Sequence, residues 1–134
     1  MNKQIFLNLP VADVAKSKAF YQALGYSFNP QFTGDEAACV IISESIFVML
    51  GTADKIRQFT PKTLCNPRKE VSVVISLSCE SRQEVDDLVA KALANGGSTD
   101  DKAEDLGFMY SHSFLDLDGH GWGVFFMPAP PPQA

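Results

Sequence analysis

The sequence predicts an α+β fold in which two βαβββ repeats form a curved mixed sheet around a cleft. Two observations favour it. Two strand-to-helix units place Leu9 and Leu77 at equivalent positions, 68 residues apart, and short strand-like segments follow each unit. Such a unit leaves one face of its sheet uncovered, so it must pack against the other unit or a second chain. We therefore expect one domain over residues 1–127, with a cleft lined from both halves.

The first repeat, about residues 3–60, begins with a strand over residues 5–11, where apolar side chains alternate with others. Asp13 is placed to cap the helix that follows, and Gly25 is placed to end it. Three short segments rich in β-branched or aromatic residues are predicted strands: 26–32, 37–43 and 45–50.

The second repeat, about residues 70–127, has the same layout. A half-buried strand is predicted over residues 71–79, and Ser81 with Glu84 forms a capping box for the next helix. That helix has apolar residues at helical spacing, ending at Gly96-Gly97: Val85, Leu88, Val89, Ala92 and Leu93.

The last part of the second repeat predicts a hairpin. Strands are expected at 107–115 and 121–127, joined by an Asp118-Gly119 turn. The proline-rich residues 128–134 predict a flexible tail.

Composition narrows the function classes. The net charge is -5, and the 11 Lys and Arg residues are scattered, which argues against a nucleic-acid partner. The three cysteines lack CxxC spacing, which favours reduced thiols in a cytoplasm. No apolar run is long enough for a signal peptide or a membrane span, so we expect a cytoplasmic protein with no membrane partner.

Three segments, in this order, resemble the vicinal oxygen chelate superfamily of glyoxalases, bleomycin resistance proteins and extradiol dioxygenases. They are LPVADVAKSKAFYQALGY (9–26), ANGG (94–97) and DLDGHGWGVFF (116–126). The resemblance implies the fold described above and a homodimer. In the metal-dependent members, it also implies a divalent ion held by His, Glu or Gln from the first and last strands of each repeat.

Those four strand positions carry unusual residues here. They correspond to Phe6, Met49, Val74 and Gly123, none of which offers an imidazole or a carboxylate. A single carboxylate left in an apolar cleft would cost several kcal/mol, so glycine at 123 is the more stable choice once the metal is absent. We expect Gly123 to leave extra room beside Trp122, and we expect neither a metal ion nor another cofactor.

The residues predicted to bind a ligand are those expected to face the cleft: Phe6, Asn8, Met49, Ser76, Tyr110, His112 and Trp122. Asn8 and its counterpart Ser76 offer polar groups to a ligand, although hydrogen bonding to nearby backbone is an equal alternative. Tyr110 and His112 share a strand face and would add a phenol and an imidazole, with a partly buried, satisfied histidine as the alternative.

Other residues invite a chemical role but have a simpler structural interpretation. Asp116 and Asp118 have the spacing that a turn requires. His120 is interpreted as a turn residue, and Cys39 as a small buried hydrophobe.

Three functions stay open. The preferred one is binding of a small apolar or aromatic molecule in the cleft without metal catalysis, as in bleomycin resistance proteins. The alternative is a metal-dependent lyase or extradiol dioxygenase with ligands at non-standard positions. The third is a structural dimer without a ligand. No catalytic residue is assigned, so whether the chain is an enzyme is left open.

Overall fold

The computed structural model describes residues 3–128 and divides the chain into two compact units, Met1–Asn66 and Pro67–Ala134. Each unit is a βαβββ-like module with one four-stranded mixed sheet, as the sequence predicts. The single domain of two repeats and the cleft lined by both stay predictions. Nearly all of the predicted tail lies outside the described residues.

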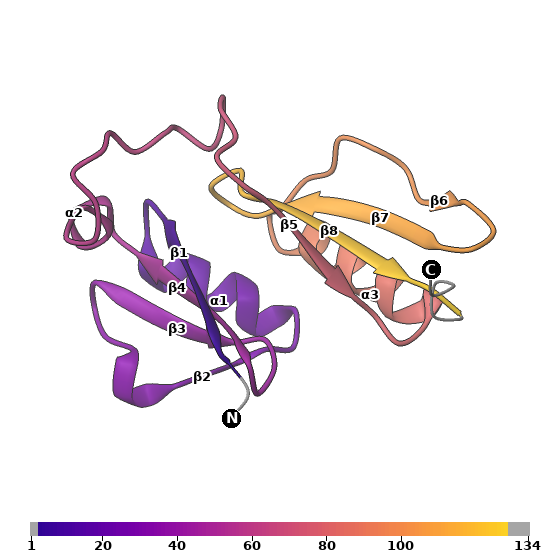
Figure 1. Ribbon diagram of the computed structural model, residues 1–134, viewed down its shortest axis with the longest axis horizontal. Helices are drawn as coiled ribbons and strands as arrows, with labels where there is room; N and C mark the ends of the chain where they lie inside the picture. The colour runs from indigo at the N-terminus through magenta and orange to yellow at the C-terminus, as the bar shows by residue number, and fades with distance from the viewer. Residues whose placement is uncertain (1–2, 129–134) are drawn as a thin grey trace. The chain divides into compact units, whose positions relative to one another are not determined.

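The first unit contains one four-stranded sheet, two α-helices and a 3₁₀ turn (Figure 1). In chain order its elements are β1 (Ile5–Pro10), α1 (Val14–Ala23), β2 (Ser27–Phe28), η1 (Pro30–Phe32), β3 (Ala37–Ile41), β4 (Ile46–Gly51) and α2 (Ala53–Arg57). The strand order is β1-β4-β3-β2. Strand β1 is parallel to β4, and the other neighbours are antiparallel.

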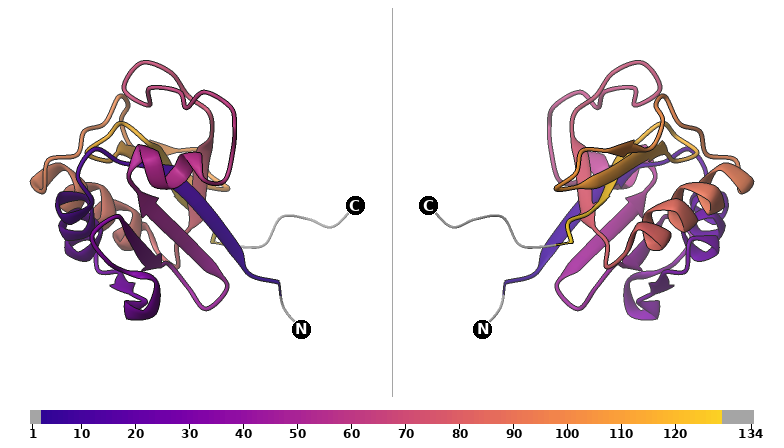
Figure 2. Two further views of the ribbon diagram at one scale, coloured as in Figure 1. Left: turned by 90° about the vertical axis from the view of Figure 1, so that its left-hand side faces the viewer. Right: turned by 90° about the vertical axis from the view of Figure 1, so that its right-hand side faces the viewer.

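Helix α1 begins and ends where its sequence predicts. The Asp13 side chain accepts a hydrogen bond from the Lys16 amide at 3.0 Å, and Gly25 has a positive φ of 107°. Figure 2 shows α1 on one side of its sheet. Buried side chains of α1 and of the sheet on that side include Leu9, Val14, Phe20, Tyr21, Leu24, Ala38, Val40, Val48 and Leu50.

Two predictions for the first unit need correction. The strand expected over 26–32 ends at Phe28, because Pro30 lacks an amide donor and the Asn29 side chain accepts from the Gln31 amide at 3.0 Å, which starts η1. Helix α2 was not predicted. It is short, and its signal is a single cap, the Thr52 hydroxyl accepting from the Lys55 amide at 3.2 Å.

The second unit repeats the layout of the first. Its elements are β5 (Val74–Ser78), α3 (Arg82–Ala94), β6 (Glu104–Asp105), β7 (Tyr110–Leu115) and β8 (Gly121–Phe126). The strand order is β5-β8-β7-β6, with β5 parallel to β8 and the other neighbours antiparallel. Helix α3 packs on β7 and β8. The side chains buried between them are Ile75, Val85, Leu88, Val89, Ala92, Phe114, Trp122 and Val124.

The capping box of α3 forms with one difference. The Ser81 hydroxyl accepts from the Glu84 amide at 3.0 Å, while the Glu84 carboxylate accepts from the amide of Glu80, not of Ser81, at 2.7 Å. Of the predicted apolar stripe, Leu93 is 46% exposed, so the buried face is narrower than the sequence predicts.

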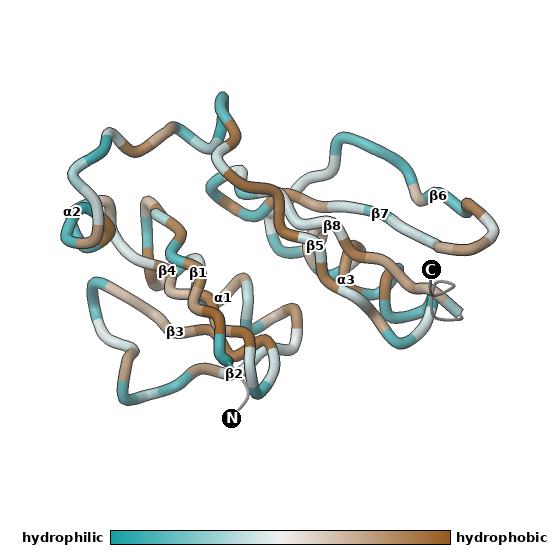
Figure 3. Tube along the Cα trace, viewed as in Figure 1, coloured by the Kyte–Doolittle hydropathy of each residue, from teal (hydrophilic) through white to brown (hydrophobic). Residues whose placement is uncertain are grey.

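The predicted strands of the second unit are too long at their starts. Strand β5 begins at Val74, and Val71 lies 71% exposed before it. The segment expected to form one strand from Gly107 instead contains a turn. Gly107 has a positive φ of 84°, and the Leu106 amide donates to the Met109 carbonyl at 2.8 Å, so β7 begins at Tyr110. Figure 3 shows that the loop before β6 is largely hydrophilic.

The turn between β7 and β8 is organised by Asp116. Its carboxylate accepts hydrogen bonds from the amides of Asp118 at 3.0 Å and His120 at 2.9 Å. The Arg68 guanidinium donates to the Leu117 carbonyl at 2.7 Å, which fixes the preceding connection against the turn. A Cβ at Gly119 would lie 2.7 Å from the Pro67 carbonyl oxygen.

Replacing Gly119 with alanine is therefore expected to destabilise the second unit. The positive φ of 97° costs an L-residue about 1–2 kcal/mol, and the clash with rigid backbone adds about 1–3 kcal/mol. Gly107→Ala is the matched control, because Gly107 also has a positive φ but nothing within 4 Å of the added carbon. Urea unfolding of both variants tests this, and equal losses would contradict a role for the Pro67 contact.

Candidate functional site

The face of the first sheet opposite α1 brings together the three predicted site residues of this unit. Phe6 pairs with Phe47, and Asn8 pairs with Met49, which also pairs with Cys39. Paired residues share a face, and residues two apart on a strand do too. We call this side, defined by Phe6, Asn8, Phe47 and Met49, the open face of the first sheet.

An aromatic pair dominates the open face. The Phe6 and Phe47 rings stack with centroids 4.7 Å apart and planes at 12°. Phe6 remains 45% exposed although it makes this contact. A stacked pair that keeps a ring face or edge toward solvent presents a flat apolar surface, which suits a flat or apolar partner.

A pocket of about 540 Å³ reaches the open face at Met49. Met49 and Ala37 belong to its lining, and Ala37 shares the open face because it lies two residues before Cys39 on β3. The remainder of the wall is contributed by residues 31–36 and by Lys55 of α2. The pocket therefore combines an apolar floor with a rim that carries one cation and the carboxylates of Asp35 and Glu36.

The second sheet has a corresponding face. Val74 pairs with Gly121 and Ser76 pairs with Gly123, and both Val74 and Ser76 are exposed. A Cβ at Gly123 would lie 3.2 Å from the Ser76 hydroxyl oxygen. The room predicted beside Trp122 is therefore misplaced, because side chains alternate along β8 and Trp122 points to the other face.

Tyr110, His112 and Trp122 share the face that α3 covers. His112 pairs with Val124, which is 1% exposed, and Trp122 is 2% exposed in the core. The Tyr110 hydroxyl donates to the Asp86 carboxylate of α3 at 2.6 Å. The ring of Tyr110 lies 5.0 Å from the guanidinium of Arg82, which in turn bonds Asp105 at 2.8 Å.

These interactions perturb the ionisation of the cluster. The hydrogen bond to Asp86 raises the pKa of Tyr110 above its ordinary value, and the hydrogen bond from Arg82 lowers the pKa of Asp105. Such bonds between a helix and a sheet are what a structural role requires. A ligand-binding role for Tyr110 stays a prediction.

His112 has a local partner on the loop after α3. Its Nε2 lies 3.4 Å from the Asp101 carboxylate and 3.3 Å from the Asp101 carbonyl oxygen. The His112 side chain is only 14% exposed. This geometry matches a partly buried, satisfied histidine, and ligand binding by His112 or Trp122 stays a prediction.

The buried cysteines are poor nucleophiles. Burial raises the pKa of the Cys39 thiol, and burial followed by the nearby Glu84 carboxylate raises the pKa of Cys79 to about 11. Both thiols are protonated near neutral pH. Cys39 therefore acts as the small buried hydrophobe that the sequence predicts.

Sequence reasoning missed two contributors to the site. Only the parallel pairing of β1 with β4 reveals that Phe47 shares the open face with Phe6. Lys55 belongs to the short helix α2, whose sequence signal is the Thr52 cap alone.

The comparisons with known proteins agree with the fold described above. Residues 3–43 match a family model described as bleomycin resistance protein-like N-terminal. The hypothetical protein SA1046 from S. aureus is 30% identical, with a TM-score of 0.78, and the match covers 94% of this chain and 95% of that one. The chain belongs to the glyoxalase/bleomycin resistance/dioxygenase superfamily.

Two more distant structures show the same superfamily fold. A glyoxalase/bleomycin resistance protein/dioxygenase family enzyme from Burkholderia phytofirmans is 15% identical, with a TM-score of 0.75, covering 94% of this chain and 99% of that one. A glyoxalase-related enzyme from Fulvimarina pelagi is 20% identical, with a TM-score of 0.78, covering 100% and 94%. No curated protein matches the sequence.

The residues of this superfamily member do not fit a divalent ion at the expected positions. Asn8 and Met49 are paired on β1 and β4, and Ser76 and Gly123 are paired on β5 and β8. Two residues earlier along the same strands, Phe6 pairs with Phe47 and Val74 pairs with Gly121. None of these side chains is an imidazole or a carboxylate.

Two further features are absent from the described part of the chain. Within residues 3–128, no group of three or more His, Cys, Asp or Glu side chains is placed to hold a metal ion. Over the same residues, no helix has the length and apolar character needed to span a membrane.

The raised pKa of the Tyr110 hydroxyl is expected to depend on its hydrogen bond to Asp86. The folded-state pKa of Tyr110 is raised, so its contribution to stability is present below the ordinary tyrosine pKa and is lost as pH rises through the folded value. In Asp86→Asn, the pKa of Tyr110 should fall toward its ordinary value, whereas Asp87→Asn on the same helix should leave it raised. An NMR titration of the Tyr110 ring measures both, and an unchanged pKa in Asp86→Asn would contradict the assignment.

Proposed function

We propose that the chain binds a small, largely apolar or aromatic molecule on the open face of the first sheet, without a divalent metal ion. The observation that carries the proposal is the stacked Phe6 and Phe47 pair beside Asn8 and Met49. Two of these residues, Phe6 and Met49, stand where the metal-dependent members of the superfamily, by the resemblance described above, have metal donors.

The geometry suits such a ligand in three ways. The stacked rings offer a flat apolar contact, and Phe6 has exposed area that a ligand would remove from water. The neighbouring pocket of about 540 Å³ lies within the usual size range of small-molecule sites. The Asn8 amide is exposed on the same face and supplies a donor and an acceptor to orient the guest.

The match to a family model described as bleomycin resistance protein-like supports a binding role, by the resemblance described above. The matched residues, 3–43, include Phe6 and Asn8. Ser76 and Val74 hold the corresponding positions of the second sheet, and we propose Ser76 as a further polar contact. A homodimer in the cytoplasm, with a small molecule as its ligand, remains part of the proposal.

The test uses an uncharged flat probe, 1-naphthol, and amide chemical shifts of the full chain. The probe should shift residues around Phe6, Phe47 and Met49, and Phe6→Ala or Phe47→Ala should weaken binding about tenfold, the loss expected for stacking plus apolar contact. Ile5→Ala is the matched control, because Ile5 is 51% exposed on the same strand but on the opposite face. Equal loss in Ile5→Ala, or shifts confined to other surfaces, would contradict the site.

The metal-free part of the proposal has a separate test. Titration of the chain with Zn²⁺, Mn²⁺ or Ni²⁺ should give no saturable stoichiometric binding with shifts at Asn8, Met49, Ser76 or Gly123. Tight binding of one ion per chain with shifts at these residues would overturn it and favour the lyase or dioxygenase alternative.

A further inference from the structure

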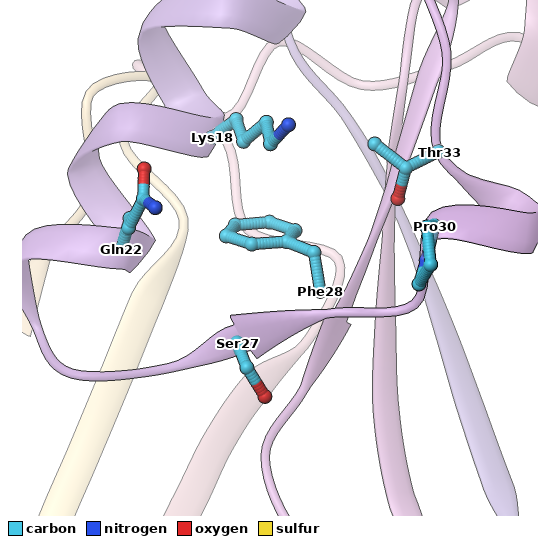
Figure 4. A pocket seen from close by; sticks show the side chains of 6 residues that line it. All are labelled: Lys18, Gln22, Ser27, Phe28, Pro30 and Thr33. Carbon is cyan, nitrogen blue, oxygen red and sulfur yellow. The ribbon is translucent and has the colours of Figure 1, made fainter.

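The first unit has a second pocket, on the side of its sheet that faces α1. Its volume is about 430 Å³, and six residues line it: Lys18, Gln22, Ser27, Phe28, Pro30 and Thr33 (Figure 4). Phe28 pairs with Val40, which pairs with Val48, and these share the α1 side. Phe28 therefore lies on the other side of the sheet from Phe6 and Met49, and Thr33 is the one residue that lines both pockets.

The fold creates this pocket at the edge of the sheet. Strand β2 has only two residues, and Pro30 then directs the chain into η1. Lys18 and Gln22 lie one turn apart on α1, and their side chains lie across the pocket from β2 (Figure 4). The pocket therefore lies between α1, β2 and η1.

The walls of the pocket have distinct chemistry. The Lys18 ammonium lies 5.4 Å from the centroid of the Phe28 ring, which forms an aromatic wall. The Thr33 hydroxyl already donates to the Asn29 carbonyl at 2.7 Å and accepts from the Cys39 amide at 3.1 Å, so it is a fixed wall. The Ser27 side chain points away from the other labelled side chains (Figure 4).

The charge of the pocket selects an anion. Its lining includes one cation, Lys18, and no carboxylate, in a chain whose net charge is -5. In the described part of the chain, no carboxylate forms an ion pair with Lys18. A half-buried ammonium beside an aromatic ring and a side-chain amide is a suitable partner for a carboxylate attached to a flat ring.

We propose that this pocket is a second binding site, which takes a small aromatic carboxylate. The carboxylate accepts hydrogen bonds from the Lys18 ammonium and the Gln22 amide. The aromatic body of the ligand packs between Phe28 and Pro30. Apart from Thr33, which lines both pockets, this inference stands on its own residues, and it does not depend on the stacked pair of Phe6 and Phe47.

The experiment uses 1-naphthoate, with its neutral isostere 1-naphthamide as the control probe. In the full chain, 1-naphthoate should shift the amides of Lys18, Gln22, Phe28 and Thr33, and 1-naphthamide should bind at least about tenfold more weakly. Lys18→Met keeps the apolar stem of the side chain and should weaken 1-naphthoate binding about tenfold or more.

Two control variants distinguish binding in this pocket from a general charge effect and from binding on the open face. Lys16→Met removes an equal charge from the exposed side of the same helix and should leave binding unchanged. Phe6→Ala should also leave it unchanged, because Phe6 lies on the other face of the sheet. The proposal is overturned if Lys16→Met and Lys18→Met weaken binding equally, if 1-naphthamide binds as tightly as 1-naphthoate, or if the shifts follow Phe6.

Discussion

In both units the first strand pairs in parallel with the last, and the other neighbours are antiparallel. This pairing decides which side chains become neighbours. It sets Phe6 beside Phe47 and Asn8 beside Met49, although about forty residues separate the partners in sequence. Because the side-chain period of a strand is two, a shift of one residue in the β1 register would place the Phe6 side chain on the helix-covered face and expose Leu9.

The elements that follow from local rules could be predicted from the sequence. Asp13 and Ser81 identify the starts of both long helices and Gly25 identifies the end of α1, because caps act within one turn. The strand after Gly25 was predicted too long, since the effect of Pro30 and the Asn29 side chain on the backbone outweighs the β propensity of Phe28 and Phe32. Helix α2 was missed because its five residues have too few turns to show a period.

The candidate site was less predictable for a physical reason. Alternation along one strand shows which residues share a face, and it correctly groups Phe6 with Asn8 and Tyr110 with His112. It does not show which of the two faces a helix covers. The hydrogen bond from Tyr110 to Asp86 shows that α3 covers the Tyr110 face, whereas Phe6 lies on the face opposite α1. Residues that look alike in the sequence therefore divide into a helix contact and an open surface.

The two faces of the first sheet also differ in the charge that they present to a ligand. On the open face, phenylalanine and methionine stand at the expected metal positions, Phe6 and Met49, and no strong local charge is left among the strand residues, so selectivity there must come from shape and apolar area. On the α1 side, the ammonium of the half-buried Lys18 side chain lies over the Phe28 ring and supplies a positive charge. A single cation in an acidic chain discriminates between an acid and its amide far better than an apolar surface does. The first sheet thus separates recognition by shape from recognition by charge onto its two sides.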